Sequence, residues 1–245
     1  MVTHPQLSAK QGIIYPDSDG EPMADNTQHF ELILWLKENI ELLFANEPNV
    51  FVAGDLLWYP VEGNNTLRQA PDAMAAFGRP KGYRGSYQQW LENNIPPQVV
   101  FEIWSPGNRL TKMANKFEFY DRYGVEEYYL YKPDSLDLTG WIRRESRLEV
   151  IEEIQGWVSP RLGVRFELTE EELQIYRPDG EPFITYLELA QQREQERQRA
   201  EQAEARAEQA ETIVEQERQR AEQAESQLQA LRALLQERGI DPTQL

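Results

Sequence analysis

The chain has 245 residues, a formal net charge of −17 at pH 7, no cysteine and two histidines. The lack of cysteine excludes disulfides, a thiol nucleophile and cysteine zinc sites. Two histidines, His4 and His29, make a histidine triad or a histidine metal cluster unexpected. Any catalysis must therefore rest on carboxylates, Lys, Arg or Tyr. The acidic charge also argues against simple electrostatic attraction to nucleic acid, which Lys and Arg normally provide.

The composition divides the chain into parts of different character. All 6 Trp, 11 Tyr and 9 Phe lie within residues 1–190, whereas residues 191–239 are almost entirely Glu, Gln, Arg and Ala. Only the first part can bury a core of its own. We therefore expect an N-terminal extension (1–24), one folded domain (25–190), a long helix (191–239) and a short tail (240–245).

No segment of the sequence has the character of a membrane anchor. The N-terminus lacks the apolar stretch of a signal peptide, and no run of about 18 apolar residues occurs anywhere. This predicts a cytoplasmic protein that does not bind membranes.

Hydrophobic spacing predicts the first elements. Apolar residues between Gln28 and Ala45 recur in mixed i+3 and i+4 steps, which favours a buried helix capped by Asp25 or Asn26. Three short segments follow, and we expect them to be a strand, a second strand and a short helix: 50–59, 72–77 and 86–92.

The middle of the domain has the order strand, helix, strand. A strand over 98–104 ends at Ser105-Pro106-Gly107, Asn108 is placed to cap a helix that runs to about Tyr123, and Gly124 is placed to end it. A strand follows at 125–131, and apolar-polar alternation then predicts a meander of three strands: 148–154, 164–168 and 173–176. Together these elements predict an α/β domain around one central sheet.

An acid inside an apolar strand is the main functional clue. Glu102 lies in the run Val99-Val100-Phe101-Glu102-Ile103-Trp104, and an unpaired carboxylate removed from water is unfavourable by several kcal/mol. Glu102 should therefore be paired, protonated or bound to a metal. Asp72 and Lys116 could join it, and two carboxylates with a lysine suit phosphodiester cleavage: the acids hold Mg²⁺, the metal activates water and the cation stabilises the phosphate.

Each of these residues also has a structural alternative. Asp72 follows Pro71 and could end a loop, whereas Lys116 could be a solvated helix residue. Glu102 could form a buried ion pair with a nearby cation, for which the candidates are Arg109, Lys112 and Lys116. Asp55 fits either a turn at the end of a strand or a further acidic member of the site.

Four segments carry a resemblance to a known family. They are QAPDAMAAFG from residue 69, PQVVFEIWSPGNR from 97, KFEFYDRYGVEEYYLYKPD from 116, and LQIYRPDGEPFITYLELAQQR from 173. In this order and spacing they resemble the bacterial Uma-two family of restriction endonuclease-like proteins, within the PD-(D/E)XK nuclease superfamily. The resemblance covers roughly residues 25–190.

The resemblance implies a restriction-endonuclease-like core, a central mixed sheet flanked by helices, and a metal-dependent endonuclease acting on DNA. Asp72 matches the first acid and Glu102 the second, so both would bind Mg²⁺, with Mn²⁺ as an alternative. The superfamily lysine two residues after the second acid is replaced here by Trp104. Lys116 is then the expected substitute as third catalytic residue. The alternative is an inactive nuclease-like domain that serves as an interaction and assembly module.

The tail has a heptad pattern. The block EQERQRAEQAE occurs at 194–204 and again at 215–225, a shift of three heptads. Positions 3 and 4 apart form an apolar seam from Ala200 to Leu235 that only Glu217 interrupts. We expect a homo-oligomeric coiled coil anchored by the leucines at its C-terminal end, since alanine buries little area. The alternative is a single solvated helix with Glu–Arg pairs.

Overall fold

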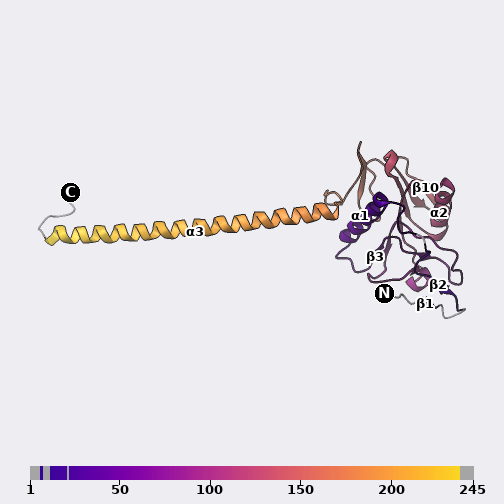
Figure 1. Cartoon of the computed structure of the whole chain (residues 1–245), viewed down its shortest axis with the longest axis horizontal. Coiled ribbons are helices and arrows are strands. Elements are labelled where there is room, and N and C mark those ends of the chain that lie inside the picture. The colour runs from indigo at the N-terminus through magenta and orange to yellow at the C-terminus, as the bar shows by residue number, and fades with distance from the viewer. Residues whose placement is uncertain (1–5, 8–11, 21, 238–245) are drawn as a thin grey trace. The chain divides into compact units, whose positions relative to one another are not determined.

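The computed structural model describes residues 6–7, 12–20 and 22–237, and it forms two compact units, Met1–Thr185 and Tyr186–Leu245 (Figure 1). The first unit is built around a six-stranded mixed sheet of order β10-β9-β8-β7-β5-β3. Only the pair β7–β8 is parallel. The strands are β3 (Val50–Ala53), β5 (Ala73–Phe77), β7 (Val99–Ile103), β8 (Glu127–Lys132), β9 (Asp137–Arg144) and β10 (Arg147–Val150).

Two helices cover the two faces of this sheet (Figure 1). Helix α1 (Thr27–Leu43) packs Ile33, Leu36 and Ile40 into one core, and α2 (Leu110–Tyr123) contributes to the other. Strand β7 serves both cores because its side chains alternate: its odd-numbered residues lie in the α1 core and Val100 lies in the α2 core. Glu102 therefore faces the α2 side. The predicted central mixed sheet with flanking helices is confirmed.

Helix boundaries follow local chemistry. Asn26 caps α1, since its side chain accepts a 2.8 Å hydrogen bond from the His29 backbone N–H. The expected cap of α2 was wrong: Arg109 occupies the N-cap position without a side-chain bond, and Asn108 donates to the Ser105 hydroxyl instead. Gly124 ends α2 with a φ of 93°, a conformation that favours glycine.

Several short elements differ from the expected ones. The segment 50–59 is not one strand, because β4 (Trp58–Tyr59) leaves the main sheet and pairs in parallel with β6 (Tyr87–Gln88). The expected helix at 86–92 is β6 followed by the 3₁₀ helix η1 (Gln89–Glu92). In the expected meander, β11 (Arg165–Leu168) and β12 (Leu173–Tyr176) form a separate hairpin. The remaining short elements are β1 (Gln6–Leu7), β2 (Ile14–Tyr15) and the 3₁₀ helix η2 (Pro133–Ser135).

The second unit contains the single helix α3 (Tyr186–Glu237), which begins five residues before the predicted start at 191. Every residue from 190 to 234 is exposed. The predicted end of the helix at 239 and the tail 240–245 lie outside the described residues. Among the described helices, none has the length and apolar character needed to span a membrane.

Candidate active site

The sheet register brings the two predicted acids together. Strands β5 and β7 are antiparallel, with Ala73 opposite Phe101 and Met74 opposite Val100. Extending this register by one residue places Asp72 opposite Glu102. Residues directly opposite in an antiparallel pair point to the same face with Cβ atoms about 4.5–5.5 Å apart. Two acids that lie 30 positions apart in the sequence are therefore brought into one site.

Asp72 is held at the end of β5 by two contacts. Its Oδ2 accepts a 2.6 Å hydrogen bond from the Ile103 backbone N–H and lies 3.1 Å from His29 Nε2. The residue is only 6 % exposed. The alternative that Asp72 merely ends a loop does not account for these contacts, since both partners come from other elements.

Glu102 has a partner for each oxygen. Lys116 Nζ donates to Oε2 at 2.6 Å, and the Tyr120 hydroxyl donates to Oε1. Burial raises the pKa of Glu102 to about 7, Lys116 opposes this shift, and the charge of Asp72 adds to it. Glu102 thus has the partners that its burial was expected to require, and its pKa lies near neutral pH.

Lys116 is a buried residue, so the alternative that it is solvated was wrong. Burial alone would lower the pKa of its ammonium group, but Glu102 and Asp72 outweigh burial and raise that pKa above its usual value. The other two cation candidates, Arg109 and Lys112, are exposed. The buried ion pair that was one alternative for Glu102 is therefore present, and its cation is Lys116.

Helical spacing explains why Lys116 reaches the site. Met113, Lys116 and Tyr120 are three and four residues apart, so they share the buried face of α2. The lysine therefore comes from α2, 14 residues after Glu102, whereas the chain position two residues after Glu102 holds Trp104. Trp104 itself is partly buried and packs against the α2 core.

Sequence reasoning missed His29 and Tyr120. The Asp25 backbone N–H donates to His29 Nδ1 at 3.2 Å, which leaves Nε2 as the proton donor to Asp72. Burial lowers the pKa of His29, but the hydrogen bond and charge of Asp72 prevail and raise it. Nothing in the sequence around His29 signals this role, whereas Tyr120 follows Lys116 by one helical turn and could have been found by spacing.

Asp55 lies at the margin of the site. It follows β3 in a left-handed conformation with a φ of 47°, and its N–H donates to the Pro71 carbonyl at 3.0 Å, as a turn residue would. Burial and the charges of Asp72 and Asp19 raise its pKa to about 6, against the opposing effects of Lys116 and His29. Asp55 thus matches the alternative of a turn at the end of a strand, and its carboxylate also interacts electrostatically with Asp72, Lys116 and His29.

The donor set suits a hard divalent cation. Mg²⁺ and Mn²⁺ prefer oxygen ligands, and Mg²⁺ is commonly bound by one or two carboxylates completed by water and substrate phosphate. Asp72 and Glu102 provide two facing carboxylates of this kind. Among the described residues no group of three His, Asp or Glu side chains is arranged to hold a metal ion, so water or phosphate would have to complete the coordination.

Two neighbouring tyrosines allow a matched test of how Glu102 is held. Their rings lie 5.2 Å apart, but the Tyr120 hydroxyl bonds Glu102 whereas the Tyr128 hydroxyl is buried without a partner. We expect Tyr120→Phe to lower the free energy of unfolding by about 1–3 kcal/mol, because it removes a bond to a buried carboxylate. Tyr128→Phe should be neutral or stabilising. Urea unfolding of both variants checks this, and equal effects would contradict the assigned bond.

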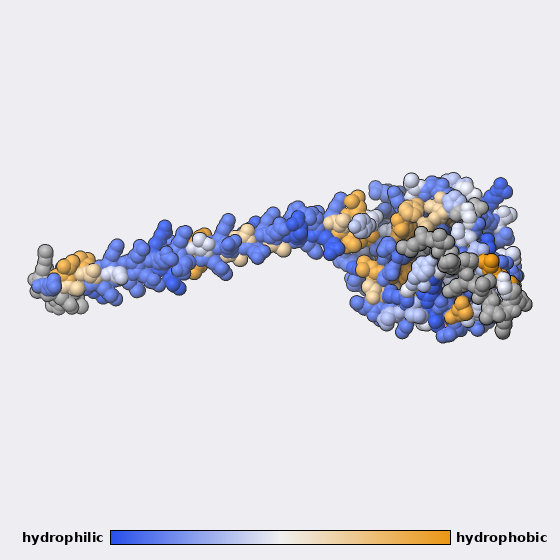
Figure 2. Space-filling model, turned by 60° about the horizontal axis from the view of Figure 1, so that its bottom comes forward, coloured by the Kyte–Doolittle hydropathy of each residue, from blue (hydrophilic) through white to orange (hydrophobic). Residues whose placement is uncertain are grey.

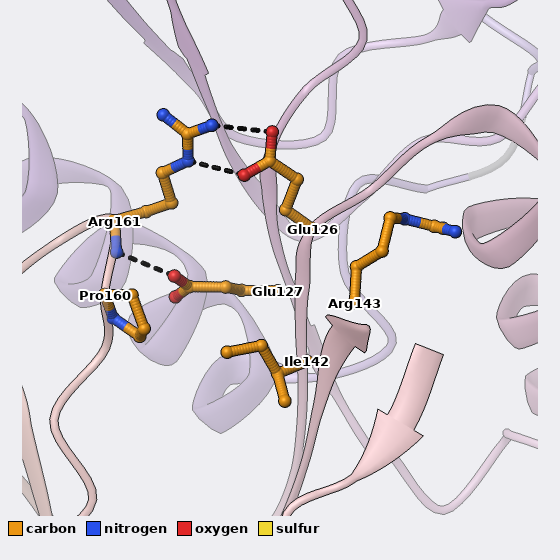
Figure 3. A pocket seen from close by; sticks show the side chains of 6 residues that line it. All are labelled: Glu126, Glu127, Ile142, Arg143, Pro160 and Arg161. Atoms are coloured by element: carbon orange, nitrogen blue, oxygen red, sulfur yellow. Dashed lines mark hydrogen bonds and ion pairs between the residues drawn. The ribbon is translucent and has the colours of Figure 1, made fainter. Parts of the chain in front are cut away.

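A cavity away from these residues has a different character. It has a volume of about 390 Å³ and is lined by Glu126, Glu127, Ile142, Arg143, Pro160 and Arg161. Figure 3 shows the Arg161 guanidinium paired with Glu126 through two 2.6 Å bonds, while Arg143 points away from both acids. Glu127 is buried and accepts from the Arg161 N–H at 2.7 Å and the Tyr129 hydroxyl at 2.9 Å. Of the two acids that line the cavity only Glu127 is buried, so this lining has no pair of buried carboxylates like Asp72 and Glu102.

Of the comparisons with known proteins, the match to a family model agrees with the family resemblance. A solved structure from Anabaena variabilis, described as a putative nuclease belonging to DUF820, is 16 % identical with a TM-score of 0.40, and covers 55 % of this chain and 72 % of its own. No curated protein matches the chain. The family model Uma2, described as "Putative restriction endonuclease", matches residues 4–208, which is more than half of the sequence. The chain therefore belongs to the Uma2 family of restriction endonuclease-like proteins.

Proposed function

We propose that this protein is a Mg²⁺-dependent endonuclease that hydrolyses DNA phosphodiester bonds at Asp72, Glu102 and Lys116. The observation that carries the proposal is the pair of buried carboxylates facing each other across β5 and β7, with Lys116 Nζ 2.6 Å from Glu102. Membership of the Uma2 family supports the same class of reaction.

The residues of the proposed site have different roles. Asp72 and Glu102 would hold the metal, which, when bound, supplies charge neutralisation at the phosphate and lowers the pKa of a coordinated water. The Ile103 N–H and His29 fix one oxygen of Asp72, and Tyr120 fixes one oxygen of Glu102. These contacts pre-orient the acids, which reduces the reorganisation required when the substrate binds.

Lys116 would provide the fixed positive charge of the site. Its ammonium is held in its charged form by the surrounding acids, and it reaches the site from α2 rather than from β7. A cation in a buried setting stabilises developing charge on a phosphate more strongly than a solvated one. Arg109 and Lys112 lie two turns and one turn earlier, exposed on the same helix, where they could contact DNA phosphates.

A second function is favoured by one specific observation. Both oxygens of Glu102 are already bonded within the chain, as in a closed structural ion pair. This arrangement fits a nuclease-like domain without activity, used together with α3 as an assembly module. Under that reading Lys116 only neutralises Glu102.

Plasmid cleavage distinguishes the two functions. The purified full chain, incubated with supercoiled plasmid and Mg²⁺, should convert it to the nicked or linear form, and EDTA should stop the conversion. Mn²⁺ is expected to substitute for Mg²⁺. Absence of conversion would favour the inactive assembly module, and conversion that continues unchanged in EDTA would contradict the proposed Mg²⁺ dependence.

A further inference from the structure

Helix α3 carries apolar residues that no other described part of the chain covers. Ile213, Val214, Leu228 and Leu231 are each at least 50 % exposed. Along α3, Figure 2 shows long hydrophilic stretches interrupted by apolar patches, one of them near the C-terminal end of the helix. A helix of 52 residues without a packed face depends on its own side-chain pairs or on a partner.

Most of the apolar residues, including Val214, Leu228 and Leu231, fall on one seam when α3 is read in heptads, and Ile213 lies beside it at a g position. With Ala200 at position a, the a and d positions continue without a break to Leu235 over five heptads. These positions are Ala200, Ala203, Ala207, Ala210, Val214, Glu217, Ala221, Ala224, Leu228, Leu231 and Leu235. The seam is therefore long enough to pair with another helix of the same period.

The charges beside the seam are sorted by sign. Three g positions are arginine, namely Arg199, Arg206 and Arg220, and the e positions five residues after each are Glu204, Glu211 and Glu225. In a parallel, in-register pair each g residue meets the e residue of the partner helix, so all three contacts join opposite charges. In an antiparallel pair that overlaps the whole seam, e meets e and g meets g. Glu204 then lies opposite Glu225 and Glu211 opposite Arg218, so repulsive and attractive contacts balance, and each g-position arginine meets an uncharged residue. The two remaining g–e contacts of the parallel pair carry a charge on one side only.

The same charges are largely unused within one chain. Over the described part of α3, the ion pairs involve Arg197, Arg218 and Arg220 with glutamates of the same helix. Arg199, Arg206 and the three e-position glutamates form none of these pairs. Five of the six residues that flank the seam with sorted charge are thus available to a partner.

We propose that α3 pairs with α3 of a second copy of this chain in a parallel, in-register, two-stranded coiled coil. The sorted e and g charges favour this partner and this orientation, since every contact between two charged residues beside the seam is attractive only when both helices run the same way. The nuclease-like units of the two chains are then attached to the same end of the coil. This pairing does not depend on the proposed nuclease activity.

Glu217 helps to fix the alignment of the two helices. It occupies a d position, where a parallel pair would bring two Glu217 side chains together, and within the chain it is 2.9 Å from Arg220 Nη1. Each Arg220 can neutralise the Glu217 of its own helix in that layer. A polar residue on the seam lowers stability but opposes shifted alignments, in which Glu217 would lie against an alanine or leucine.

Single engineered cysteines test the orientation, because the chain has none of its own. Ala210→Cys and Ala224→Cys place a thiol at two d positions, and Ala205→Cys and Ala233→Cys place one on the outer f face as controls. Under mild oxidation of the full chain, each d-position variant should crosslink with itself and the controls should not. In an antiparallel pair a positions face d positions, so crosslinking only in a mixture of Ala210→Cys with Ala221→Cys, an a position, would show an antiparallel pair, and no crosslinking above the controls would show a single helix. Either outcome overturns the proposal.

Charge reversal tests why the helices pair. Light scattering should give a mass of two chains for the wild type, and a mass of one or three chains would contradict the proposal. Replacing the three g-position arginines by Glu should weaken association by at least about tenfold, since every sorted contact becomes repulsive. Adding Glu→Arg at the three e positions should restore it. Failure of the second set to restore association, or no effect of the first, would show that these charges do not select the partner.

Discussion

The Asp72→Asn variant is expected to bind Mn²⁺ at least about 100-fold more weakly than the wild type. Loss of an outer partner of a metal ligand typically costs roughly 10- to 100-fold in affinity, and Asp72 is a proposed ligand itself. The amide can still accept the Ile103 N–H, so the local fold should persist while the charge is lost. Titration of Mn²⁺ followed by electron paramagnetic resonance measures the affinity directly.

A second buried glutamate supplies the matched control. Glu102→Gln should weaken Mn²⁺ binding in the same way as Asp72→Asn. Glu127→Gln changes an equally buried carboxylate on the next strand, but its oxygens are bonded to Tyr129, Ser159 and Arg161, away from Asp72. Its Mn²⁺ affinity should match the wild type. Equal affinity in all four proteins would show that the two acids are not the metal site.

Lys116→Met is expected to lower the free energy of unfolding by about 3–5 kcal/mol. The variant removes one partner of a buried ion pair and leaves Glu102 without its cation, which costs far more than a surface pair. The double variant Lys116→Met with Glu102→Gln should regain most of this loss, because no uncompensated charge remains. Urea unfolding of the single and double variants measures both effects.

The same variants separate a catalytic lysine from a structural one. If Lys116 acts on the phosphate, cleavage per folded molecule should fall sharply in Lys116→Met under conditions where the variant remains folded. Lys112→Met, one turn earlier and exposed, is the control and should leave the stability unchanged. Full Mg²⁺-dependent cleavage by folded Lys116→Met would show that the ion pair serves the fold alone.

The fold could be predicted where local pattern and tertiary packing agree. The periodicities around α1, β5, β7, α2 and β8 gave these elements because each has a continuous apolar face. Strand β9 was not expected, since Gly140 and charged residues interrupt its pattern. The structure explains the glycine: a Cβ at position 140 would lie 2.8 Å from the Ile154 side chain. The departure of β4 from the main sheet depends on its pairing with β6, about 30 residues away, which no local pattern signals.

The apolar stripe expected on α2 shows the same limit. Helical spacing in the sequence places Leu110, Met113, Phe117 and Tyr120 on one stripe. Leu110 is instead 76 % exposed, and the buried face is Met113, Lys116, Phe119 and Tyr120. This face brings Lys116 to the carboxylate of Glu102, a contact that a search for an apolar stripe does not reveal.

The sequence predicts the part of the candidate site in which a charged residue lies within an apolar strand. Glu102 was found because an acid in an apolar strand needs a partner, and the structure supplies Lys116 as that partner. His29 was missed because its contact with Asp72 spans 43 residues and joins a helix to the end of a strand. Such a contact follows from the packing of α1 against the sheet, which the sequence of α1 does not specify.

Plasmid cleavage by the wild type beside Asp72→Asn, Glu102→Gln and Glu127→Gln tests most directly whether the facing carboxylates form a nuclease site. All four proteins are compared at equal folded concentration in Mg²⁺ and in EDTA. The expected result is Mg²⁺-dependent cleavage by the wild type and Glu127→Gln, with loss of cleavage in Asp72→Asn and Glu102→Gln. Cleavage by either of the latter two at the wild-type rate, or none by the wild type, would contradict the proposed site.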